Sequence, residues 1–197
     1  MAFGFAALAR TETAAPLSRT LGPDDWTRRS VPLLGNPREL VKDLCARHLP
    51  STGTAVVAVL GLDGRLVASA SFASVSSRGD GWERRNAVLD HLRRVTTHDL
   101  RLRAPVRTGV LMVCREGGPN WMPADGAWMW GLSDACTLHG LRCGAYVTLS
   151  DGGWQVLGEG RSGRTPHAGS WTARPVPNAW SGGPTAMPDA PRRHVAR

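Results

Sequence analysis

Lysine and isoleucine are almost missing from this chain: Lys42 is the only lysine among 197 residues, and no isoleucine occurs. The net charge of +8 therefore rests on arginine, since the 24 basic residues outnumber 16 acidic ones. A basic balance is the electrostatic footprint of many nucleic-acid-binding proteins. GC-rich coding also produces an arginine-rich chain that abounds in Ala, Gly and Pro. The charge alone is therefore weak evidence for a nucleic-acid partner.

Long apolar runs are missing as well. No run has the roughly 20 apolar residues that a membrane-spanning helix needs. The start, MAFGFAALAR, is apolar for only a few residues and lacks the basic region of a signal peptide. We therefore expect a cytoplasmic protein that does not bind membranes and that keeps its thiols reduced. The four cysteines are Cys45, Cys114, Cys136 and Cys143.

The composition changes along the chain in a way that predicts one domain between two tails. Residues 1–35 contain several Pro and Gly without a clear period, which predicts a loosely ordered arm that Trp26 could pin. Residues 36–160 carry the periodic apolar segments of a single domain. From 161 to 197, Gly, Pro, Arg and Ser dominate, which predicts a disordered tail.

Two hairpins are predicted within the domain. The runs TAVVAVLGL and RLVASASF flank Asp63-Gly64, which is a strong tight-turn signal. The runs CGAYVTL and WQVLGEG flank the second turn, SDGG. A further apolar run, TGVLMVC, lies between the hairpins and predicts a buried strand that ends at Cys114.

Three helices are predicted around these strands. The first follows Asn36, a good cap. The second is WERRNAVLDHLRRVTTHDL, in which Val88, Leu92 and Val95 form the inner face and the arginines a solvated one. The third runs from about Gly126 to His139, with Asp125 as its N-cap. The fold class is therefore mixed α/β (α+β): one domain with an about five-stranded mixed sheet, hairpins, and about three flanking helices.

From about Thr54 to Gly160, the order of these elements resembles a JAB/MPN domain, in particular the RadC-like branch. In that family a strand leads into His-x-His, and a Pro/Gly loop reaches Ser-x-x-Asp at the start of a helix. That helix ends in Gly plus an aliphatic residue, as Gly140-Leu141 do here, and TLSDGGWQVL follows in the expected place.

The resemblance places Asp125 on the metal-binding Asp of the family, and Cys114 and Glu116 on its two His positions. No Ser precedes Asp125, because Met122, Pro123 and Ala124 stand there, and LVASASF contains no carboxylate to activate water. The resemblance therefore implies a member without catalysis. Such a member would be an interaction or adaptor domain, with DNA transactions as one setting, and would need no cofactor.

A metal-dependent hydrolase is the alternative, with zinc held by Cys114, Glu116 and Asp125. The simpler interpretation is that Cys114 ends a buried strand, Glu116 is a solvated loop acid and Asp125 caps a helix. The loop from 115 to 125 contains no His to complete a usual zinc set, which favours the simpler interpretation. If Asp125 is only a cap, Asn in its place preserves most of the effect.

Two weaker possibilities concern the cysteines. Cys136, His139 and Cys143 could hold zinc, but they lack the paired spacing of structural sites. Cys114 could be a nucleophile if His91, His98 or His139 approached it in the fold.

Tryptophan and arginine gather where an interface could form. Exposed Trp beside Arg is typical of protein interfaces and of single-stranded nucleic-acid binding. Trp128 and Trp130 lie two residues apart on a helix, so both cannot face the core. We expect a protein partner or self-association at Trp121, Trp128, Trp130, Arg84, Arg85, Arg93 and Arg94. The alternative is a nucleic-acid-binding protein that uses the Arg-rich second helix and the tails.

Overall fold

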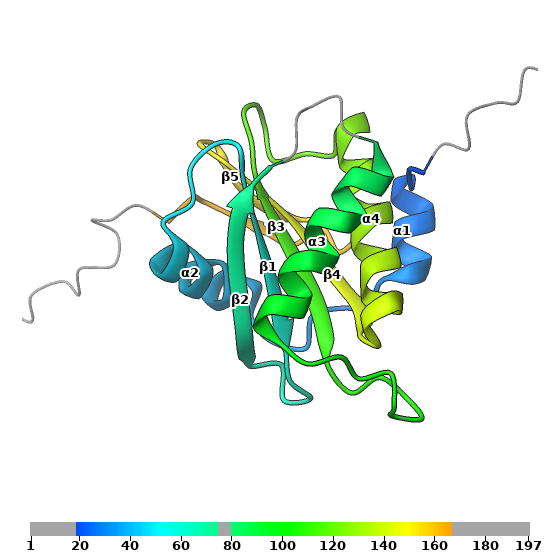
Figure 1. The fold of residues 1–197 in the computed structure, drawn as a ribbon. Helices are drawn as coiled ribbons and strands as arrows, with labels where there is room; N and C mark the ends of the chain where they lie inside the picture. Colours follow the sequence, from blue (N-terminus) through cyan, green and yellow to red (C-terminus); the bar gives the residue numbers. More distant parts are fainter. Residues whose placement is uncertain (1–18, 75–79, 167–197) are drawn as a thin grey trace, which may run out of the picture. The chain divides into compact units, whose positions relative to one another are not determined.

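A six-stranded mixed sheet runs through the domain, in the order β2-β1-β3-β4-β5-β6 (Figure 1). The structure, a computed structural model, describes residues 19–74 and 80–166. Only β3 and β4 pair in parallel, and the other neighbours are antiparallel. The strands are β1 (Thr54–Leu60), β2 (Leu66–Ala73), β3 (Thr108–Cys114), β4 (Arg142–Ser150), β5 (Gly153–Val156) and β6 (Ser162–Gly163).

Four helices cover both faces of the sheet (Figure 1). They are α1 (Pro23–Arg29), α2 (Pro37–His48), α3 (Gly81–Val95) and α4 (Pro123–His139). The alternation of side chains in β1 divides the core in two: Val57 and Val59 pack in the cluster that includes residues of α1, α3 and α4, whereas Val56 and Ala58 pack in the cluster that includes residues of α2. Because both faces are covered, β1 and β3 are apolar almost throughout.

The mixed α/β class and both hairpins follow the sequence prediction, with one strand more than expected. The turn at Asp63-Gly64 joins β1 to β2, and Gly64 has a φ of 73°, which suits glycine. The additional strand, β6, contains only two residues and lies beyond the predicted domain end at 160. A segment of that length carries no alternating pattern, so sequence reasoning could not find it.

Helix α1 was not predicted, because residues 1–35 were interpreted as a loosely ordered arm. Its residue Trp26 is fully buried and donates a hydrogen bond from Nε1 to the Leu157 carbonyl at 3.1 Å. The Trp26 ring also meets Tyr146 edge-on, with 6.3 Å between centroids. Seven residues are too few to show a helical period, so this helix depends on tertiary packing. Residues 1–18 of the predicted arm and 167–197 of the predicted tail lie outside the described residues.

Helix α4 begins earlier than predicted. Pro123 is its first residue and Met122 its N-cap, so Asp125 is the third helical residue and not the cap itself. The Asp125 carboxylate reaches back to accept a hydrogen bond from the Met122 N–H at 2.7 Å. Proline suits the first position of a helix and an acid suits the third, so the sequence did contain this signal.

The predicted loop between a central strand and a helix start is confirmed. It leaves the carboxyl end of β3 and reaches α4, and β3 lies inside the sheet between β1 and β4. Helix α4 packs along α3 and approaches it closely at Gly131, where a Cβ would lie 2.9 Å from the Arg85 backbone nitrogen. Within residues 19–74 and 80–166, no helix is both long and apolar enough to cross a bilayer.

Candidate functional site

A pocket of about 330 Å³ opens where β3 ends and where α3 and α4 begin. The loop before β1 closes one side, because the Gly53 N–H donates to the Cys114 carbonyl at 2.9 Å. The residues predicted as a possible metal group, Cys114, Glu116 and Asp125, all line this pocket. Arg84 and Arg115 line it too, and sequence reasoning had placed neither in a site with Asp125.

The Asp125 carboxylate is buried, with 1% of the residue exposed, and each oxygen has a donor. Oδ2 accepts from the Met122 N–H at 2.7 Å and from Arg115 Nη2 at 3.0 Å. Oδ1 accepts from the Tyr146 hydroxyl at 2.9 Å. The carboxylate is thus paired with a guanidinium and bonded to a helix N-terminus and a phenol.

Tyr146 is fixed as a donor by its surroundings. It lies on β4 and is fully buried. Burial raises its pKa well above the usual value of 10.0, and the neighbouring Asp125 charge raises it further. The hydroxyl therefore keeps its proton at neutral pH and donates it to Asp125.

The Arg115 guanidinium donates hydrogen bonds to backbone carbonyls of the loop between β3 and α4. Nη1 donates to the Gly118 carbonyl at 3.0 Å, and Nη2 donates to the Asn120 carbonyl at 2.6 Å as well as to Asp125. Its Nε is buried without a hydrogen-bond partner. The loop therefore wraps around one guanidinium, which lies beside Asp125.

Arg84 is the second cation of the pocket, and it is 2% exposed. The sequence analysis placed it on a solvated face and in a surface interface, which is wrong for this residue. Nη1 donates to the Ala124 carbonyl, and the guanidinium lies 5.0 Å from the Trp128 ring centroid. Burial lowers the pKa of Arg84, and the charge of Asp125 offsets part of that effect. An arginine still stays protonated.

Arg84 has no paired carboxylate in the part of the chain that the structure describes. Its Nε is buried and has no hydrogen-bond partner. A buried charge without a counterion is costly, so this residue marks the pocket as unusual.

The residues of the metal and thiol alternatives do not form the arrangements those alternatives need. Residues 19–74 and 80–166 contain no group of three His, Cys, Asp or Glu side chains that could hold a metal ion. Burial raises the pKa of the Cys114 thiol to about 12, whereas a nucleophilic cysteine needs a lowered pKa. Among the candidate bases, His91 stacks on Phe72 with 4.3 Å between centroids.

The second cysteine group is divided between two surroundings. A hydrogen bond with Cys143 raises the pKa of the buried Cys136 thiol well above its usual range, and burial adds to this. His139 lines a separate pocket with Arg93, His98 and Arg101, and neither of its ring nitrogens has a hydrogen-bond partner.

The predicted interface residues are spread over several places. Trp128 is buried, Trp130 is half-buried and Trp121 is 39% exposed, so only one of the two helical Trp residues faces the core squarely, as expected. Arg93 and Arg94 are exposed, and Arg94 pairs with Asp90 at 2.7 Å.

A cation–π group formed by residues of α3 and α4 together with Arg19 includes two residues that the prediction missed, Trp82 and Arg19. The Arg85 guanidinium lies 3.7 Å from the Trp82 ring centroid, and that of Arg19 lies 4.2 Å from the same ring. Trp82 meets Trp130 at 6.2 Å. The sequence contained this signal, since Trp82 and Arg85 lie three apart on one helix.

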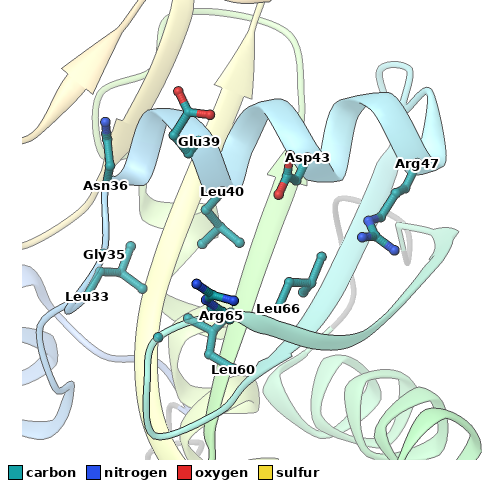
Figure 2. Close-up of a pocket in the computed structure, with 11 residues that line it drawn as sticks. Leu33, Gly35, Asn36, Glu39, Leu40, Asp43, Arg47, Leu60, Arg65 and Leu66 are labelled. Atoms are coloured by element: carbon teal, nitrogen blue, oxygen red, sulfur yellow. The ribbon is translucent and has the colours of Figure 1, made fainter.

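A second pocket lies between α2 and the β1–β2 hairpin, with a volume of about 370 Å³. Figure 2 shows Leu40, Leu60 and Leu66 lining it, with Arg65 reaching in from the hairpin and Glu39 pointing away. Its charged groups lie along an open rim and none of them is buried. This pocket therefore has no buried charged group in its lining that could fix a ligand, unlike the pocket at Asp125.

No known protein-family model matches the chain, and no curated protein matches it either.

Proposed function

We propose that this chain is a non-catalytic, RadC-like JAB/MPN-type domain in which the end of β3 and the start of α4 form a binding site and not a metal centre. The order hairpin, α3, β3, loop, α4, strand pair supports the family part of this proposal. From the sequence, the proposal also takes the expectation that the site binds a protein partner or a second copy of the chain, and that the protein works in the cytoplasm.

The observation that carries the proposal is the state of Asp125. A zinc ligand of this kind must present a free carboxylate oxygen to the metal. Here one oxygen accepts from Tyr146, and the other accepts from both Arg115 and the Met122 N–H. A guanidinium bonded to the carboxylate also repels a divalent cation, so Arg115 replaces the metal electrostatically.

The residue types around the pocket support the same conclusion. A JAB/MPN zinc site needs two imidazoles, and Cys114 and Glu116 stand at those positions by the resemblance. Zinc-dependent nucleobase deaminases use a different signature, H-x-E…P-C-x-x-C. The start of α4 reads Pro123-Ala124-Asp125-Gly126-Ala127, with alanine at both cysteine positions of that signature.

Metal analysis of the full-length protein, purified without chelators, tests the proposal. We expect far less than one zinc per chain. We also expect that a zinc titration finds no uptake that is lost when Asp125 is replaced. The contrary result is about one zinc per chain that is lost in both Asp125→Asn and Cys114→Ser, since loss of an anionic ligand weakens a zinc site. Asp63→Asn is the matched control, because Asp63 is an exposed hairpin acid far from the pocket lining.

A further inference from the structure

The buried charges of the pocket at Asp125 are only partly paired. Arg84 and Arg115 bring two guanidinium groups, and Asp125 brings the one buried carboxylate of the lining. Arg115 forms the ion pair with Asp125, so Arg84 is left without a direct ion pair, although the charges of Asp125, Glu83 and Asp80 partly stabilise it. Glu116 also lines the pocket, but it is exposed, and water and salt screen an exposed charge. Residues 75–79, which follow the pocket residue Ser74 in the chain, include no Asp or Glu.

Two buried donors of the pocket are unused. The Nε atoms of Arg84 and Arg115 are both buried and have no hydrogen-bond partner. Buried polar atoms in native proteins nearly always have partners, so two such atoms around one pocket call for a ligand that accepts hydrogen bonds. An anion beside the Arg84 guanidinium would supply the charge partner that Arg84 lacks.

The backbone adds to this preference. Arg84 lies in the first turn of α3, and Ala124 and Asp125 lie in the first turn of α4, so two helix N-termini adjoin the pocket. The positive ends of these helix dipoles favour a negative charge. The carboxylates of Asp80 and Asp125 each accept a backbone hydrogen bond at one of these helix ends. Neither forms an ion pair with Arg84 in the described ranges.

The remaining walls are apolar. Val113, Met122 and Trp128 line the pocket, and its volume of about 330 Å³ lies at the lower end of the range for small-molecule sites. A bare inorganic anion would leave most of this apolar surface in contact with water. The shape and chemistry therefore suit a ligand with a charged head and an apolar body.

We propose that this pocket binds a small organic monocarboxylate, whose carboxylate accepts hydrogen bonds from the Arg84 guanidinium and whose apolar or aromatic body lies along Val113, Met122 and Trp128. A monoanion matches the one guanidinium without an ion pair, and the planar guanidinium fits the two oxygens of a carboxylate. The inference rests on the proposed function, because it requires that no metal occupies the site.

Isothermal titration of the full-length protein with phenylacetate and with its neutral counterpart phenylacetamide tests this inference. We expect phenylacetate to bind at least about tenfold more tightly, since only the carboxylate forms a charge-assisted hydrogen bond with a buried guanidinium. Inorganic phosphate should bind more weakly than phenylacetate, because it lacks the apolar body.

Ala124→Leu is the blocking variant. Ala124 lines the pocket with an exposed side chain, so a larger residue should fill the space without disturbing the core. We expect this substitution to weaken phenylacetate binding at least about tenfold, because the leucine side chain would occupy the space of the ligand. Arg84→Lys should weaken binding as well, since an ammonium cannot form the paired contact. The control Arg101→Gln, whose side chain lines a different pocket, should bind as the original chain does.

Three results would overturn the inference. They are equal binding of phenylacetate and phenylacetamide, undiminished binding in Ala124→Leu, and no binding of phenylacetate, benzoate or hexanoate by folded, zinc-free protein. The last result leaves the proposed non-catalytic function intact. About one zinc per chain that depends on Asp125 overturns both proposals, so the two failures are distinguishable.

Discussion

Arg115 Nη2 lies 3.0 Å from Asp125 Oδ2, although the two residues stand at opposite ends of the loop between β3 and α4. The pair closes the loop, and the same guanidinium also bonds the carbonyls of Gly118 and Asn120. The Asp125 carboxylate thus finds its hydrogen-bond donors within the chain itself. What remains available to a ligand is the positive charge of Arg84.

Replacing Tyr146 by Phe should destabilise the fold by about 1.5–3 kcal/mol, because a buried carboxylate oxygen loses its donor. The Tyr146 hydroxyl bonds Asp125 Oδ1 at 2.9 Å and Phe fills the same space. Urea unfolding of both proteins measures the difference. Thr137→Ala serves as the control, since its exposed hydroxyl bonds only the Ser133 carbonyl and its loss should change stability by less than about 0.5 kcal/mol. Equal small effects in both variants would show that Tyr146 does not support Asp125.

Alkaline pH should destabilise the protein through Cys114. Burial raises the pKa of this thiol from 9.0 to about 12, so the unfolded chain loses the proton first as pH rises. Stability is then fully present below pH 9.0 and falls as pH rises toward about 12, by at most about 1.4 kcal/mol per pH unit for this one group. Urea midpoints between pH 8 and 10.5 should fall less steeply in Cys114→Ala. Parallel profiles for the two proteins would contradict this prediction.

Acid should destabilise the protein through His139, whose residue is buried near the end of α4. Burial lowers its pKa below the usual 6.5, the Thr96 backbone offsets part of this, and the nearby Arg107 and His98 lower the pKa further. The folded chain therefore resists the proton that the unfolded chain takes up. Stability is present above pH 6.5 and falls as pH drops below it.

Thermal unfolding from pH 7.5 to 5 measures this effect of His139. The slope should be shallower in His139→Gln, which cannot take up a proton, and His91→Gln provides the comparison at a histidine of another helix face. A slope that is unchanged in His139→Gln would assign the acid sensitivity to other groups.

Gly131 should be sensitive to the smallest possible enlargement. A Cβ at this position would lie 2.9 Å from the Arg85 nitrogen and 3.2 Å from the Arg84 carbonyl carbon, so α3 and α4 would have to separate. We expect Gly131→Ala to cost about 1–3 kcal/mol, as overpacking usually does. Gly118→Ala is the matched control, because nothing lies within 4 Å of its Cβ position. Chemical denaturation that finds the two variants equally stable would contradict the close approach of the helices.

Local signals in the sequence predicted much of the fold. The Asp63-Gly64 turn, the apolar run of β3 and the capped start of α2 depend on neighbouring residues, and all three lie where they were expected. Helix α1 was missed because its stability comes from Trp26, which packs against residues more than a hundred positions away.

The site was only partly predictable. The position of Arg84 did contain a signal, since it precedes Val88 by four residues and Leu92 by eight, so all three share the buried face of α3. The pattern was overlooked because arginine is rarely fully buried. The Arg115–Asp125 pair had no comparable signal, because the geometry of an irregular loop decides which side chain reaches the carboxylate. The residues predicted for the metal alternative line one pocket, and Asp125 forms its ion pair there with Arg115.

A double-mutant cycle on Asp125 and Arg115 tests most directly whether the Asp125 carboxylate forms a stabilising ion pair with the Arg115 guanidinium. The cycle compares unfolding free energies of the original chain, Asp125→Asn, Arg115→Gln and the double variant. We predict that each single change costs about 3–5 kcal/mol, as breaking a buried pair does, and that the two effects are non-additive by about 2 kcal/mol or more. A simple helix cap predicts a mild effect of Asn. Additive effects within about 0.5 kcal/mol, together with a mild Asp125→Asn, would contradict the account.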